Sequence, residues 1–135
     1  MSRFSESVKS GLLKATETAR NIEQIDSIFQ DLAVQVENTS KGVVTFKRVS
    51  SDPLVTWSKL VKPELNQKNS GRLALKNIKG ALDIVAYWEQ AADGYPFIIK
   101  YDGQRHDCWD DESLVNILST IVSSGAFWIR VQKLI

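Results

Sequence analysis

The chain has 135 residues, which fits one domain (residues 1–135) and suffices to bury a hydrophobic core. Its apolar fraction of 43% and charged fraction of 24% are those of an ordinary globular protein rather than a disordered chain, and no apolar run approaches the ~18 residues of a membrane span. The single cysteine, Cys108, excludes an intrachain disulfide and favours a reducing compartment. Since the first residues also lack the apolar core of a signal peptide, we expect a cytoplasmic protein without a membrane partner.

Residues 5–37 are predicted to form an amphipathic helix. Its apolar side chains recur at steps of three and four, so they share one stripe: Val8, Leu12, Ala15, Ala19, Ile22, Ile25, Phe29, Leu32 and Val36. One continuous helix would be ~50 Å long, more than the ~30–35 Å diameter expected for a domain of this size. We therefore expect the helix to protrude, to pair with another chain or to break. Asn21 and Gln24, three residues apart, match a variant of the capping box, so Asn21 is the position at which a break would fall.

Residues 43–109 are predicted to form an antiparallel sheet of about five to six strands. Apolar and polar side chains alternate in the segments VVTFKRV, LVTWSKLV, RLALKNI, ALDIVAYWEQ and YPFIIKYDGQRHDCW. The last segment contains the dipeptide Asp102-Gly103, which suits a tight two-residue turn and predicts a hairpin.

Residues 111–135 are predicted to form a helix followed by a strand. Asp110 or Asp111 can cap a helix over about 111–124, and Gly125 is placed to stop it. The remaining residues are apolar almost throughout, which predicts a strand inside the sheet. The order of elements indicates an α+β fold, with the helices packed on one face of an antiparallel sheet.

The residues that could support catalysis form no complete site in the sequence. His106 and Cys108 would share one strand face, but two ligands do not make a zinc site, and no oxyanion pocket or orienting group is signalled. Asp83 and Glu89 would lie ~20 Å apart, beyond the ~5–10 Å of a glycosidase pair. Glycine-rich phosphate loops are absent. We expect a protein that is not an enzyme and holds no metal or cofactor.

Two segments are candidates for binding a protein. Trp109 stands between a polar strand and an acidic helix start, so an aromatic anchor with an acidic rim of Asp107, Asp110 and Asp111 is one hypothesis. The alternative is that Trp109 holds the helix on the sheet while the acids only begin the helix. The stripe over residues 8–36 is the second candidate, and it would make the protein a homodimer.

Nucleic acid is the alternative partner, because the net charge of +1 is unevenly distributed. Residues 41–80 hold nine basic and two acidic side chains, whereas the flanking segments are acidic. The candidate contacts are Lys47, Arg48, Lys59, Arg72, Lys76 and Lys79, with Trp57 or Phe46 for base stacking. The same charges could instead pair across neighbouring strands.

The prediction from the sequence is thus a non-catalytic binding protein that acts through a protein partner or through self-association. Small α+β proteins of this general type include immunity proteins, inhibitors and phage or plasmid accessory proteins. That likeness is one of type alone and does not fix the function.

Overall fold

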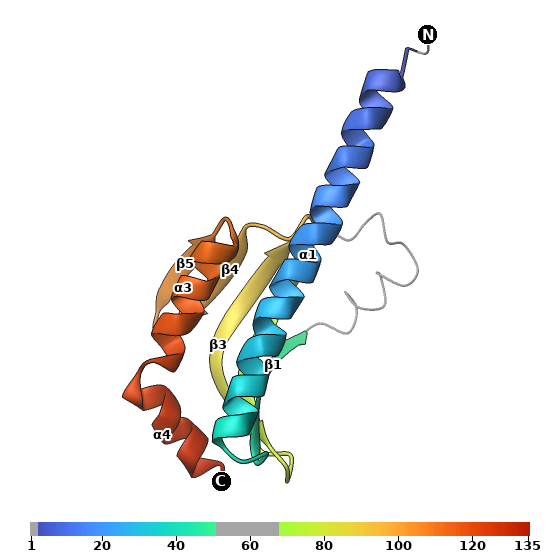
Figure 1. The fold of residues 1–135 in the computed structure, drawn as a ribbon. Helices are drawn as coiled ribbons and strands as arrows, with labels where there is room; N and C mark the ends of the chain where they lie inside the picture. Colours follow the sequence, from blue (N-terminus) through green and yellow to red (C-terminus); the bar gives the residue numbers. More distant parts are fainter. Residues whose placement is uncertain (1–2, 51–67) are drawn as a thin grey trace.

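A computed structural model describes residues 3–50 and 68–135, and these residues form one long helix, an antiparallel sheet and two shorter helices (Figure 1). The elements follow the order α1 (Ser5–Thr39), β1 (Val44–Ser50), β2 (Lys68–Asn77), β3 (Leu82–Ala91), β4 (Phe97–Tyr101), β5 (Gln104–Cys108), α3 (Asp111–Val122) and α4 (Gly125–Lys133). Sequential strands are neighbours throughout the five-stranded sheet. The predicted strand over 54–61 lies outside the described residues.

The predicted α+β class is confirmed, and the described helices share one face of the sheet. In the core, alternate residues of the strands, such as Leu73, Trp88 and Ile99, pack against buried side chains of the three helices in the described part of the chain. The helices contribute Ile25, Phe29, Val36, Leu114, Leu118, Ile121, Phe127 and Val131. Because side chains alternate along a strand, the other set of strand residues points away from the helices.

The predicted break at Asn21 is wrong, since α1 runs without interruption from Ser5 to Thr39. The two residues of the expected capping box bind the β3–β4 loop instead. The amide of Asn21 donates a hydrogen bond to the Asp93 carbonyl at 3.1 Å, and Gln24 accepts one from the Tyr95 hydroxyl at 2.8 Å. Gly94 lets the loop approach this closely, because a Cβ there would lie 2.8 Å from that of Asn21.

The predicted final strand is also wrong, because residues 125–133 form helix α4. Ser124 caps this helix by accepting a hydrogen bond from the backbone N–H of Phe127 at 3.2 Å. Phe127 and Val131, four residues apart, are its buried residues, so the apolar run follows the helical period. Arg130 ties α4 to the sheet through the Ile84 carbonyl at 2.8 Å and Asp83 at 3.3 Å.

Two local predictions are confirmed. The hairpin of β4 and β5 turns at Asp102 and Gly103, whose φ angles of 54° and 76° are the left-handed values that this turn requires. Asp110 caps α3 by accepting a hydrogen bond from the Ser113 N–H at 2.8 Å, and the Ser113 hydroxyl completes a capping box.

Candidate functional site

The first half of α1 extends beyond the sheet, as Figure 1 shows at the N-terminal end. We call residues 5–20 the α1 arm. The predicted apolar stripe divides where the arm meets the domain: Ile25, Phe29 and Val36 are buried in the core, whereas Val8 and Leu12 are 56% and 64% exposed. Ala15 and Ala19 continue the exposed part of the stripe. Only the arm therefore presents this stripe to a partner.

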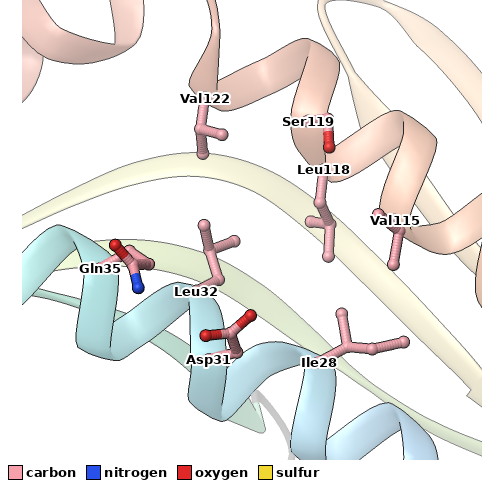
Figure 2. Close-up of a pocket in the computed structure, with 8 residues that line it drawn as sticks. All are labelled: Ile28, Asp31, Leu32, Gln35, Val115, Leu118, Ser119 and Val122. Carbon is pink, nitrogen blue, oxygen red and sulfur yellow. The ribbon is translucent and has the colours of Figure 1, made fainter.

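A shallow groove runs between α1 and α3, lined mainly by aliphatic side chains (Figure 2). Its walls are Ile28 and Leu32 on one side and Val115, Leu118 and Val122 on the other, and these side chains point toward one another across it. The volume of about 160 Å³ is below the ~300 Å³ of the smallest usual ligand pockets. We read it as the seam between two packed helices.

Two of the three acids predicted to surround Trp109 have partners of their own. Trp109 lies between β5 and α3 and is 68% exposed, so it does not hold the helix on the sheet. Asp110 is committed to the α3 cap, and its hydrogen bonds from Ser113 keep the pKa of that carboxyl below its usual value. Asp107 forms an ion pair with Arg105 at 2.9 Å. Asp111, the first residue of α3, remains exposed beside them.

His106 and Cys108 lie on the helical face of β5, opposite Ile99 and Phe97 of β4. Burial, reinforced by the negative charges of Asp107 and Asp110, raises the pKa of the Cys108 thiol to about 11. The thiol is therefore protonated near neutral pH and is a poor nucleophile. Among residues 3–50 and 68–135, no group of three or more His, Cys, Asp and Glu side chains is arranged to hold a metal ion.

The predicted basic contacts do not form one surface. Arg48 is on the helical face of β1, where it binds Asp26 and donates a hydrogen bond to Gln90 at 3.1 Å. Lys79 lies in the turn between β2 and β3, and Lys59 lies outside the described residues. Phe46, one proposed stacking residue, is buried in the core, and Trp57 also lies outside the described part.

Three of the predicted cations do lie together, on the face of the sheet that the helices leave uncovered. We call this the open face. Lys47 of β1 and Arg72 and Lys76 of β2 project there, since their strand neighbours Phe46, Leu73 and Leu75 are in the core. In the described part of the chain, no acidic side chain pairs with any of the three.

The strand register adds residues that the sequence analysis did not include. Arg72 is opposite Tyr87, Tyr87 is opposite Lys100, and Lys100 is opposite Arg105. We call these four residues the basic row. The row runs across the sheet from β2 to β5, and Tyr87, which is 52% exposed, lies between two of its cations. The alternation of side chains along β3 predicts that Tyr87 and the core residue Trp88 lie on opposite faces. The spacing along the chain could not predict that Tyr87 lies beside Arg72 and Lys100.

The side of the molecule that the helices cover is acidic, whereas the open face is basic. Residues 21–39 of α1 contain Glu23, Asp26, Asp31 and Glu37 and no basic residue, and Asp110, Asp111 and Glu112 begin α3. Arg48 of β1 and Arg130 and Lys133 of α4 offset only part of this charge. The open face carries Lys47, Arg72, Lys76, Lys100 and Arg105 against Glu89 and Asp107. The net charge of +1 thus conceals a molecule with a basic side and an acidic side.

No single helix among the described residues is long and apolar enough to cross a membrane, and only α3 and α4 together, bent by 64°, reach that length and composition. No protein-family model, curated protein or solved structure matches the chain.

Proposed function

We propose that this protein is a non-catalytic binding protein that acts as a self-associated pair, with the α1 arm of one copy packed against the arm of a second copy. The observation that supports this proposal is the exposed apolar stripe of the arm, which contains two residues more than half exposed, Val8 and Leu12. Exposed apolar patches of this kind mark interaction surfaces in soluble proteins.

The arm gains most from a partner that is itself a helix. Its 16 residues span ~24 Å, and its stripe faces water along that length. Helical segments of this size have marginal stability without packing, and Gly11 weakens the arm by a further ~1 kcal/mol relative to alanine. A second helix on the stripe supplies the packing that the arm lacks within its own chain.

The distribution of large and small side chains favours a second copy in antiparallel orientation. The large residues Val8 and Leu12 are nearer the tip of the arm, and the small residues Ala15 and Ala19 are nearer the domain. Antiparallel pairing about the midpoint of the stripe places Val8 opposite Ala19 and Leu12 opposite Ala15. Large residues then fill the space beside small ones, which suits two helices ~8–10 Å apart. A parallel pair would place leucine on leucine and alanine on alanine.

The charges of the arm are compatible with the same alignment. Lys9 falls opposite Thr18, and Glu17 falls opposite Ser10. Arg20 falls opposite Ser7. No two like charges are brought face to face, so electrostatic repulsion does not oppose the pairing.

The non-catalytic part of the proposal is supported by the state of the nucleophile candidate. Cys108 is buried, and its raised pKa of about 11 keeps it as a thiol. The α1–α3 groove has Asp31, Gln35 and Ser119 beside its aliphatic walls, but its volume of about 160 Å³ is below that of usual substrate pockets.

Sedimentation velocity over a wide range of protein concentrations tests the self-association. The wild type should show a monomer–dimer equilibrium, and Leu12→Glu should shift it strongly toward the monomer. Leu13→Glu is a matched control, because Leu13 is equally exposed at 65% but lies about 100° around the helix from Leu12. A wild type that remains monomeric at every concentration would refute self-association, as would equal effects of the two variants.

A further inference from the structure

We infer that the open face of the sheet is a binding site for single-stranded nucleic acid, centred on the basic row. This inference rests on side chains of β2 to β5 and is independent of the α1 arm. The four residues of the row are exposed, and they come from four strands that the register brings into one line.

Tyr87 supplies the surface on which a base can stack. Its ring is 52% exposed on a face that none of the described helices covers. Neighbouring strands are ~4.8 Å apart, so the strand positions of Arg72 and Lys100 flank the ring at that spacing on either side. An aromatic ring between two cations accommodates a base and the phosphates on both sides of it.

Two further cations extend the site beyond the basic row. Lys47 and Lys76 lie on the β1–β2 side of the same face, while Arg105 ends the row one strand beyond Lys100. The cations therefore form a band rather than a point, which suits a chain of phosphates more than a single anion.

Two acidic residues on the open face compete for the cations. Glu89 lies 3.8 Å from Lys100, and Asp107 lies 2.9 Å from Arg105. These side chains are a third to more than half exposed, and ion pairs of this kind contribute little stability. Phosphate groups can therefore displace them, while Arg72 has no acidic partner among the described residues.

The shape of the face favours single strands over a duplex. Stacking on Tyr87 requires an unpaired base. The open face is a sheet surface, and none of the described helices projects from it to enter a groove of a duplex. The acidic helical side repels a polyanion, so the charge distribution directs a strand to the open face.

Fluorescence anisotropy with labelled oligothymidylate and oligouridylate, at about 50 and 200 mM salt, tests the inference. We expect binding that weakens with salt, and weaker binding to a duplex. Arg72→Ala combined with Lys100→Ala should weaken binding more than tenfold and reduce the salt slope by about 1.4, for two lost phosphate contacts. Tyr87→Val should weaken binding about tenfold, whereas Tyr87→Phe should retain it.

Lys133→Ala, at an exposed position of α4, removes a cation from the helical side and should leave affinity unchanged. The inference is overturned if the wild type fails to bind at low salt, if a duplex binds as well as a single strand, or if Lys133→Ala weakens binding as much as Arg72→Ala combined with Lys100→Ala. Retained affinity in Tyr87→Val would overturn the stacking role. Circular dichroism establishes that each variant is folded. Repeating the titration with Leu12→Glu separates this site from self-association, because the sheet of a monomer keeps its basic row.

Discussion

Arg48 of β1 forms an ion pair with Asp26 of α1, so this cation lies between the helix and the sheet rather than on an exposed basic surface. Its guanidinium carbon lies 4.9 Å from the ring centroid of Phe29 and 5.5 Å from that of Trp88. A hydrogen bond to Gln90 completes its surroundings. Arg48 is thus a structural residue that links α1 to the strands.

Replacing Arg48 should therefore reduce stability, whereas replacing its neighbour should not. We expect Arg48→Ala to lower the free energy of unfolding by about 1–3 kcal/mol through lost hydrogen bonds and ring contacts. Lys47→Ala should stay within about 0.5 kcal/mol, because Lys47 is exposed on the open face. Urea denaturation measures both values, and equal losses would contradict the placement of the two side chains.

Replacing Trp88 should reduce stability far more than replacing Trp109. Trp88 is 3% exposed and stacks on Phe97 at 5.7 Å, so Trp88→Ala should lower the free energy of unfolding by about 3–5 kcal/mol. Trp88→Phe should be far milder, since the buried indole N–H has no hydrogen-bond partner in the described residues. Trp109→Ala should change stability by less than about 0.5 kcal/mol. Acrylamide should quench the fluorescence of Trp109→Ala less than that of the wild type; unchanged quenching would mean that Trp109 is covered.

Helix α4 can be distinguished from a strand by two substitutions. Ile129 and Val131 would share a face in a strand, but they are 54% and 2% exposed in the helix. Val131→Ala should lower the free energy of unfolding by about 2 kcal/mol, and Ile129→Ala by less than about 0.5 kcal/mol. Comparable losses measured by urea denaturation would favour a strand.

Stability should fall in alkaline solution, partly because of Cys108. Its pKa rises from the ordinary 9.0 to about 11 in the folded protein, so the thiol stabilises the fold fully below pH 9. The unfolded chain loses this proton more readily as the pH rises, and the contribution disappears as the pH passes the folded value of about 11. Denaturation midpoints of Cys108→Ala should consequently vary less between pH 9 and 11 than those of the wild type.

Tyr95 provides the control for that measurement. Burial, followed by the charges of Asp111 and Asp110, raises its pKa from 10.0 to about 12. Tyr95→Phe should therefore flatten the pH dependence above pH 10 and leave the change between pH 9 and 10 to Cys108. An unaltered profile in Cys108→Ala would show that the thiol pKa differs little between the folded and unfolded states.

Sequence patterns alone predicted the elements whose determinants are local. The Asp102-Gly103 turn requires left-handed backbone at two adjacent residues, and the α3 cap needs only Asp110 and the N–H group three residues later. The α+β class follows from the change between helical and strand periods. Each of these features depends on residues only a few positions apart.

Tertiary structure decided the continuity of α1 and the conformation of residues 125–133. Asn21 and Gln24 could cap a helix, but the β3–β4 loop binds both side chains, and the helix continues. An apolar run such as 126–135 fits a buried strand or a helix, and only its packing against the core selects one.

The basic row could not be predicted from the sequence, because it too depends on tertiary structure. Arg72, Tyr87, Lys100 and Arg105 are aligned by three strand registers, including a shift between Leu73 and Ala74 of β2. Sequence alone determined which side chains are charged or aromatic and, through the period of two, that alternate residues share a face. Which of them become neighbours was decided by hydrogen bonding between strands distant in the chain, because a displacement of one residue would move each side chain to the opposite face.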